Sequence, residues 1–488
     1  MVLALGLLGS VAGPGWSPRT LESTIVTQTD DVSIGGDVAT LPVGSLAVTS
    51  TLVEVELDGA VVEAEISAPE VASDPDPPQY PGVVFIHGAG TGHHTAFGQT
   101  ARALASAGVV AMVPDKRLDT YTTRERDYPR MAEDYLASVE LLRELPYVDP
   151  ERVGVYGESE GCWIAPIVAA TDPDVAFLIQ VSAPVVPPRQ QAAFATDAYL
   201  RNVGVPSALL RAIPRGIGSQ VPGGGFEYVD FNVRPYQRVV EQPALIVYGT
   251  ADASMPTVQG ALAMIDDMAE AGNDAYTVRY FADANHGIRV GSTLVPEFLE
   301  VLARWIQGLP ETARAEPRIA GEQPQQRFAA DPVERPRWYA DGDVLVAGLQ
   351  AGAVAIAIGP ALWLVAVLVR RRPKPLPAPV AKWMAVVALG TLLTLAAFAG
   401  YLVRVGRLAL DYQTDPLFVH GGWLVVQMLG VATAVAYVLS VSRAVVAGRA
   451  SQLGRTGWIG LLTIAGVHVG TLALLIFAAY WGVYPAVP

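Results

Sequence analysis

The stretch Val153-Gly-Val-Tyr-Gly-Glu-Ser-Glu-Gly161 decides the fold of this chain. Its first four residues predict a buried strand, and the apolar residues from Cys162 onward predict a helix. Between them, residues 157–161 form a Gly-x-Ser-x-Gly sequence in the strand–turn–helix context that holds a nucleophile above a sheet edge. The glycines allow a sharp turn without Cβ clashes, and the helix N-terminus favours negative charge. The stretch therefore predicts that Ser159 is a nucleophile.

Strands and helical stretches alternate around this motif. Apolar runs and period-2 patterns predict strands at 52–57, 61–66, 82–86, 109–113, 153–156, 177–181, 244–248 and 276–281, and helices at 100–107, 128–145 and 296–307. This order predicts an α/β fold, a mainly parallel sheet flanked by helices. Residues 184–243 are too long for an ordinary loop and predict a cap, with a disordered insertion as the alternative. The Pro- and Arg-rich residues 310–343 predict a linker.

The histidine positions favour a serine-based site. Of six histidines, only His286 lies after Ser159 and before the apolar C-terminal third. A hydrolase with this turn has the chain order serine, acid, histidine. Asp252 follows a strand at its carboxyl end, where sites of open α/β sheets lie, and is the predicted acid. The alternatives are a surface histidine at 286 and, for the acid, Asp172, Asp174 or Asp283.

The loop at residues 87–92, His-Gly-Ala-Gly-Thr-Gly, follows another buried strand. Its small residues let backbone N–H groups approach an oxyanion, so Gly88 and Ala89 are predicted donors, together with the N–H of Glu160 after the nucleophile. A phosphate-binding loop is the alternative, but the spacing fits neither common phosphate motif. His93 and His94 come next. Since the sequence offers no evident third metal ligand, we expect them to be structural or to line the substrate site and expect no metal.

On these residues the chain resembles the α/β-hydrolase superfamily, and most closely the serine hydrolases of the dienelactone hydrolase and serine aminopeptidase type. The resemblance covers about residues 45–308 and rests on the following sequences: Phe-Ile-His-Gly-Ala-Gly90, Pro-Asp-Lys-Arg117, Val-Asp-Pro-Glu-Arg-Val-Gly154, Gly-Glu-Ser-Glu-Gly161, Ile-Ala-Pro166, Tyr-Gly-Thr-Ala-Asp252 and Asn-His-Gly287. It implies an α/β-hydrolase fold and a Ser159–Asp252–His286 triad without a cofactor. Two residues depart from the pattern, because relatives usually carry histidine where Glu158 stands and glycine where Cys162 stands. The carboxylate of Glu158 is expected to line the substrate site and to affect the base or the preferred substrate charge.

Charge divides the chain into two unlike parts. The net charge is −14 and only 16% of residues are charged, well below the roughly 25% of an average soluble domain. Residues 344–488 carry ten basic and two acidic residues, whereas residues 1–343 have a net charge of −22. Such an acidic part repels phosphate backbones, so we expect no nucleic-acid partner. Cys162 is the only cysteine, which excludes an intrachain disulfide.

Four long apolar runs fill the basic part, at 344–369, 383–403, 417–441 and 457–484. Each has at least 21 residues, enough to cross a bilayer core of about 30 Å, so we predict a bundle of four transmembrane helices. The short loops predicted to be cytoplasmic carry Arg370, Arg371, Arg372, Lys374 and Lys382, and Arg443, Arg449 and Arg455. In the remaining loop, Arg404 and Arg407 are offset by Asp411 and Asp415. The N-terminal domain is then extracytoplasmic, and the apolar residues 1–16 resemble a signal sequence.

These observations predict domains at 17–309, with a cap at about 184–243, and at 344–488. The expected function is that of a membrane-anchored extracytoplasmic carboxylesterase in the cell membrane, acting on small or lipid-like esters. A serine peptidase is the first alternative. A non-catalytic domain that serves as a sensor or docking module for the membrane helices is the second.

Overall fold

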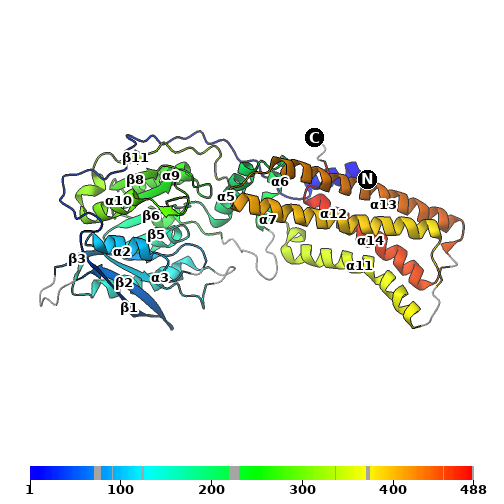
Figure 1. Cartoon of the computed structure of the whole chain (residues 1–488), viewed down its shortest axis with the longest axis horizontal. Helices are drawn as coiled ribbons and strands as arrows, with labels where there is room; N and C mark the ends of the chain where they lie inside the picture. Colours follow the sequence, from blue (N-terminus) through cyan, green and yellow to red (C-terminus); the bar gives the residue numbers. More distant parts are fainter. Residues whose placement is uncertain are drawn as a thin grey trace. The chain divides into compact units, whose positions relative to one another are not determined.

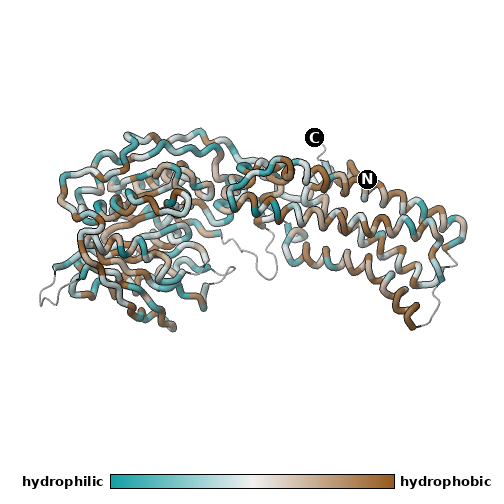
Figure 2. Tube along the Cα trace, in the orientation of Figure 1, coloured by the Kyte–Doolittle hydropathy of each residue, from teal (hydrophilic) through white to brown (hydrophobic). Residues whose placement is uncertain are grey.

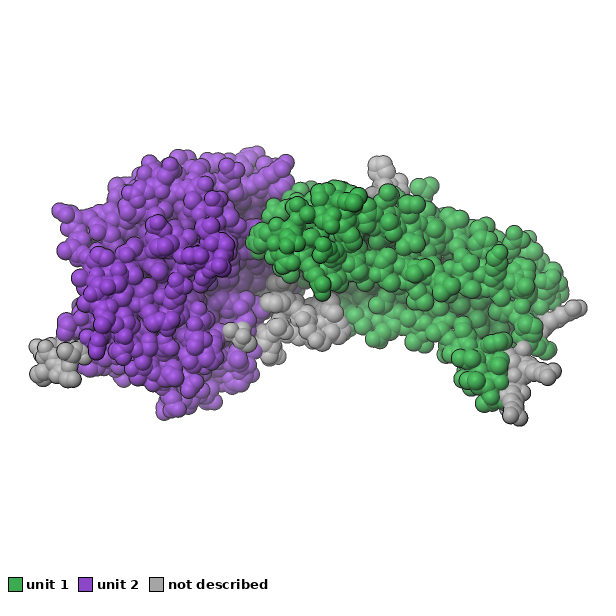
Figure 3. All heavy atoms as spheres, viewed as in Figure 1, with its two compact units in different colours: residues 1–17, 196–226, 333–488 green, residues 18–195, 227–332 purple. Residues whose placement is uncertain are grey.

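The computed structural model describes residues 1–70, 78–90, 92–121, 126–218, 230–335, 337–369, 374–453 and 456–485. They form two compact units (Figure 3). The sheet unit consists of residues 18–195 and 227–332, and the helical unit consists of residues 1–17, 196–226 and 333–488. Among the predicted features, Arg370 to Arg372, Arg455 and residues 219–229 of the cap lie outside the described residues.

The sheet unit contains a nine-stranded sheet (Figure 1). Its order is β1 (Val48–Leu57), β2 (Ala60–Pro69), β4 (Val110–Pro114), β3 (Tyr80–Ile86), β5 (Val148–Glu158), β6 (Leu178–Val181), β7 (Ala244–Gly249), β8 (Tyr276–Phe281) and β11 (Ile319–Gly321). β2 is antiparallel to β1 and β4, and all other neighbours pair in parallel. The predicted mainly parallel sheet is confirmed. Because parallel strands share one carboxyl edge, the segments after β3, β5, β7 and β8 meet there.

Helices cover both faces of this sheet. They are α2 (Gly98–Ser106), α3 (Tyr128–Arg143), α4 (Gly161–Thr171), α8 (Arg234–Gln237), α9 (Thr257–Glu270) and α10 (Pro296–Gln307), with the 3-10 helix η1 (Glu311–Arg314) and the short hairpin β9 (Arg289–Val290) and β10 (Thr293–Leu294). The side chains of β3 alternate between faces, as the period of two requires. Val83 and Phe85 pack with α2 and α10, whereas Val84 and Ile86 pack with α3 and α4.

Two predicted segments differ from their expected form. The expected linker at 310–343 contains η1, the sheet strand β11 and the 3-10 helix η2 (Trp338–Ala340). A strand of three residues is too short to show a sequence pattern, so β11 forms only because it pairs with β8. The expected cap contains α5 (Pro188–Val203), α6 (Ser207–Arg211), α7 (Ile213–Gly218) and α8. Of its described residues, 196–218 group with the helical unit and 230–243, with α8, group with the sheet unit, so α5 begins in one unit and ends in the other.

The helical unit contains four long helices: α11 (Gly342–Leu368), α12 (Ala378–Leu410), α13 (Pro416–Arg449) and α14 (Trp458–Tyr480). Each is long and apolar enough to cross a membrane, and Figure 2 shows the hydrophobic residues along them. Many of their large apolar side chains are exposed, for example Leu364, Leu393 and Leu424. Apolar residues on the outside of long helices are typical of contact with lipid.

Glycines let α11 and α14 approach closely. A Cβ on Gly466 would overlap the carbonyl oxygen of Ala355, and one on Gly470 would overlap that of Gly352. Gly466 and Gly470 form the small-xxx-small pattern of membrane helix pairs. His468 lies between them, and its Nε2 is 3.0 Å from Oγ of Ser440 on α13.

The N-terminal residues also belong to the helical unit. Helix α1 (Val2–Val11) packs on α14, where a Cβ on Gly9 would overlap the carbonyl oxygen of Ala479. The hydroxyl of Tyr339 donates to the carbonyl of Ala12 at 2.8 Å. Arg215 on α7 is buried and donates to the carbonyl of Pro14 at 3.1 Å. The signal sequence stays a prediction for this segment.

Candidate active site

Ser159 stands at the turn between β5 and α4. Its φ is +57°, a left-handed conformation that strains a residue other than glycine. A Cβ on Gly161 would overlap the carbonyl oxygen of Ile86, and a Cβ on Gly157 would lie 2.8 Å from the carbonyl oxygen of Gly161. Close packing therefore requires both glycines of the motif, and the structure has the sharp turn that the sequence predicts.

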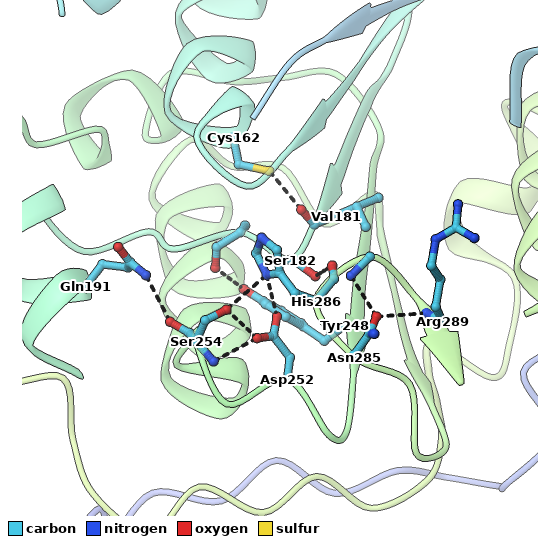
Figure 4. Close-up of polar contacts among 12 residues, drawn as sticks. Cys162, Val181, Ser182, Gln191, Tyr248, Asp252, Ser254, Asn285, His286 and Arg289 are labelled. Carbon is cyan, nitrogen blue, oxygen red and sulfur yellow. Dashed lines mark hydrogen bonds and ion pairs between the residues drawn. The ribbon is translucent and has the colours of Figure 1, made fainter. Parts of the chain in front are cut away.

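Asp252 and His286 come together, as predicted. Nδ1 of His286 lies 2.9 Å from Oδ2 of Asp252 (Figure 4). The Asp252 side chain is completely buried, whereas that of His286 is 33% exposed. Ser254, which the sequence analysis missed, donates from Oγ to Asp252 at 2.6 Å and lies 3.1 Å from Nδ1 of His286. Since these contacts use Nδ1, Nε2 is the nitrogen left for a reaction partner.

The charges of this pair stabilise each other. Burial would raise the pKa of Asp252, but the charge of His286 and the hydrogen bonds from His286 and Ser254 outweigh it, so this pKa is lowered. Burial would lower the pKa of His286, but Asp252 outweighs it, so this pKa is raised above its usual 6.5. The pair is therefore built to hold an imidazolium beside a carboxylate.

Strand β6 links Ser159 to the histidine. The N–H of Ser159 donates to the carbonyl of Val181 at 3.0 Å, and the next hydroxyl, Oγ of Ser182, donates to the carbonyl of His286 at 2.8 Å. Among the residues that the structure describes, none hydrogen-bonds to Oγ of Ser159. Bonds between a nucleophile and its base are often long in a free enzyme and tighten with substrate.

The predicted oxyanion loop lies against the nucleophile. A Cβ on Gly88 would lie 3.2 Å from Cβ of Ser159, so bare backbone allows this approach. Within the described parts of the chain, the N–H groups of Gly88, Ala89 and Glu160 have no hydrogen-bond acceptor. Backbone donors without partners beside a nucleophile are suited to hold negative charge that develops during acyl transfer. These are the three donors expected from the sequence.

The side chain of Glu160 has a second set of contacts that the sequence analysis missed. It is 1% exposed, and its carboxylate accepts four hydrogen bonds, from Lys116 Nζ (3.0 Å), Tyr121 OH (2.8 Å), Arg126 Nη1 (2.6 Å) and Tyr128 OH (3.2 Å). We call these five residues the Glu160 cluster. Two cations share one carboxylate, so the cluster is a buried group with excess positive charge. The Asp-Lys-Arg sequence that supplies Lys116 was visible, but no spacing rule joins it to Glu160.

Glu158 directly precedes Ser159 in the chain. Its Oε2 accepts a hydrogen bond from the hydroxyl of Tyr156 at 3.0 Å. Burial raises the pKa of Glu158, and the charge of His286 opposes this effect. Glu158 in turn contributes to the raised pKa of His286. The extra carboxylate therefore acts on the histidine, and its expected contact with substrate stays a prediction.

His93 and His94 gain a third polar partner in the structure. Asp115 accepts from the N–H of His94 at 2.6 Å and lies 2.9 Å from its Nδ1. One ligand atom from each of the three residues lies within 4.8 Å of the others, a group that can hold a metal ion. The sequence offered no third ligand because Asp115 is 21 residues away, at the end of β4.

Two family models match parts of residues 69–293. The dienelactone hydrolase family model matches residues 69–195, and the model of the BAAT / acyl-CoA thioester hydrolase C-terminal domain matches residues 134–293. The first match contains Ser159, and the second contains Ser159, Asp252 and His286.

Individual relatives are distant. A protein of Aspergillus clavatus named probable dipeptidyl peptidase 4 is 27% identical over 161 residues, which are 32% of this chain and 19% of that protein. The matched part thus spans about a fifth of that relative. Solved structures that align with part of this chain include a dienelactone hydrolase from Anabaena variabilis (16% identical, 53% of this chain and 96% of that chain, TM-score 0.35). Dipeptidyl peptidase 4 from Porphyromonas gingivalis is another (17% identical, 53% and 35%, TM-score 0.38).

The family-model matches agree with the sheet order and with the strand–turn–helix at Ser159. The sheet unit therefore has the α/β-hydrolase fold and resembles domains of the dienelactone hydrolase type, in a chain with four long apolar helices in its C-terminal region.

Proposed function

We propose that this chain is a membrane-anchored serine hydrolase that cleaves acyl esters of small or lipid-like molecules. One observation carries the proposal: the backbone N–H groups of Gly88, Ala89 and Glu160 have no acceptor among the described residues, and Gly88 lies against Ser159, a serine in a strained turn. The His286–Asp252 pair supports it as the matching base and acid. Ser159, Asp252 and His286 are then the catalytic residues, and Gly88, Ala89 and Glu160 supply the oxyanion donors.

The proposed reaction proceeds through an acyl-enzyme. Nε2 of His286 takes the proton of Ser159 while Oγ attacks the carbonyl carbon, and Asp252 stabilises the imidazolium. The N–H donors hold the oxyanion of the tetrahedral intermediate. As the intermediate collapses, His286 gives its proton to the departing alcohol, and Ser159 keeps the acyl group as an ester. Water that His286 deprotonates then attacks this ester and releases the acid.

A peptidase would use the same steps, and the dipeptidyl peptidase name of the curated relative favours it as the second candidate. The test compares p-nitrophenyl esters with aminoacyl p-nitroanilides on the full chain in detergent, with Ser159→Ala as control. We expect ester hydrolysis that Ser159→Ala abolishes and a lower kcat/KM on the anilides. A higher kcat/KM on the anilides would favour the peptidase. Turnover of neither substrate class would favour a sensor or docking module.

The proposal places the hydrolase domain outside the cytoplasm, with the four helices in the bilayer. The four apolar helices support membrane attachment, and the basic residues between the first two helices favour a cytoplasmic loop there. A reporter inserted after Lys374 should report the cytoplasm, and one inserted after Gln413 should report the outside. The reversed pattern would overturn the orientation.

A further inference from the structure

Lys116 is a buried lysine that contacts the oxyanion loop. It is 4% exposed, and its Nζ donates to the carbonyl oxygen of Gly88 at 2.5 Å and to Glu160 at 3.0 Å. A lysine is rarely buried unless it is paired, because its charge loses hydration. The ion pair with Glu160 meets that need, but the bond to Gly88 requires a separate explanation.

The carbonyl that Lys116 contacts belongs to a particular peptide group. The carbonyl of Gly88 and the N–H of Ala89 are the two ends of one amide, and that N–H is a proposed oxyanion donor without an acceptor among the described residues. Hydrogen bonds polarise one another along a chain, and a bond from an ammonium is stronger than one from a neutral group. A cation on this carbonyl makes the Ala89 N–H a stronger donor.

Glu160 connects this cation to the nucleophile. Its carboxylate holds Lys116, and its own N–H is the donor that follows Ser159. The rest of the loop is fastened to the same cluster, because the N–H of Gly90 donates to the hydroxyl of Tyr121 at 3.0 Å. The positive charge of Lys116 lies 4.1 Å from the centre of the Tyr121 ring. One buried cluster thus positions oxyanion donors on both sides of Ser159.

We propose that Lys116 is a positioning residue that polarises the Gly88–Ala89 peptide group, and that Glu160 holds it there. This inference rests on the proposed hydrolase function. Its effect is confined to the charged intermediate, since a ground-state ester gains little from a stronger donor. Removing Lys116 should therefore lower kcat and leave KM nearly unchanged.

Arg126 offers a matched comparison. It is a second buried cation on the same carboxylate, with Nη1 2.6 Å from Glu160 Oε1, and within the described parts of the chain it makes no hydrogen bond to Gly88. Arg126→Met removes one positive charge from the Glu160 cluster, as Lys116→Met does. Only Lys116→Met also removes the bond to the peptide group. The difference between the two variants isolates the polarisation of Ala89 N–H.

The experiment measures kcat, KM and the inhibition constant of a trifluoromethyl ketone, which forms an oxyanion on the serine. It uses the full chain in detergent, with active sites titrated by a fluorophosphonate. Removing a complete oxyanion donor costs about 10²–10³ in kcat, so we expect about 10–100-fold from Lys116→Met, with KM within about twofold. The inhibition constant of the trifluoromethyl ketone should rise by a similar factor. In Arg126→Met, kcat should fall several-fold less than in Lys116→Met. Lys116→Arg should retain most of the wild-type kcat.

Several outcomes would overturn the proposal. They are an equal loss in Lys116→Met and Arg126→Met, a change confined to KM, or an unchanged inhibition constant. If Lys116→Met does not fold, Lys116→Gln, which keeps an uncharged donor to Gly88, must show the same loss. Wild-type turnover that persists in Ser159→Ala would instead refute the proposed function itself, and the inference with it.

Discussion

The substitution Asp252→Asn tests the pairing of acid and base most sharply. The carboxylate is completely buried and lies 2.9 Å from Nδ1 of His286. At that distance and an effective dielectric constant of about 20, attraction between imidazolium and carboxylate is about 6 kcal/mol. Because the His286 side chain is 33% exposed, we expect about 4 kcal/mol to be lost. At about 1.4 kcal/mol per tenfold change, kcat should fall about 10³-fold.

The pH dependence gives a second readout of the same variant. In the proposed mechanism His286 must be neutral to accept the proton of Ser159, so activity is expected to fall as pH drops through its pKa. Asp252 raises this pKa above its usual 6.5. In Asp252→Asn the burial that lowers the pKa remains and the larger of the two opposing charges is lost, so the acidic limb of the pH–activity profile should move to lower pH.

The assay is kcat/KM against pH with a p-nitrophenyl ester, on the full chain in detergent. Ser254→Ala is the matched control, because it removes a hydroxyl bonded to Asp252 but leaves the charge in place. Loss of one hydrogen bond to a carboxylate, about 1.5 kcal/mol, should cost about tenfold in kcat/KM, far less than the loss expected for Asp252→Asn. A loss below tenfold in Asp252→Asn, or an acidic limb that does not move, would refute this reasoning.

Three further predictions concern the surroundings of the site and the helices. Glu158→Gln removes a negative charge that raises the pKa of His286. The acidic limb of kcat/KM against pH, measured with the same ester assay, should therefore move to lower pH, with KM unchanged. Gly161→Ala places a Cβ on the backbone oxygen of Ile86, so we expect roughly 2 kcal/mol of destabilisation in thermal unfolding, with Ser23→Ala at an exposed position as control. Gly470→Leu should separate α11 from α14 and lower the Tm of the detergent-solubilised chain, whereas Gly400→Leu, in open space, should not.

Local patterns were sufficient for most of the fold. Residues 276–281 and 296–307 form β8 and α10 with the predicted bounds, because a buried strand and a one-sided amphipathic helix carry their own periodicity. Strand β11 has only three residues and no such periodicity. It exists because β8 offers an unpaired edge, a fact that no local pattern contains.

The residues of the candidate site were also predicted only in part. Ser159, Asp252 and His286 were predicted because chain order and position after strands constrain them. Ser254, the side-chain contacts of Glu160 and the partner of His94 were not, because each depends on residues that only folding brings together. Lys116 is 44 residues from Glu160 and Asp115 is 21 residues from His94. A buried ion pair in particular resembles two ordinary surface charges until the structure places both inside.

The most direct test of the central claim is covalent labelling of Ser159. Membranes with the full chain are treated with a fluorophosphonate, and the modified residue is identified by mass spectrometry. We expect one adduct on Ser159, no adduct in Ser159→Ala, and much slower labelling in His286→Ala, which lacks the base. Absence of an adduct on Ser159, or equally fast labelling in His286→Ala, would contradict the assignment of this site as a serine hydrolase.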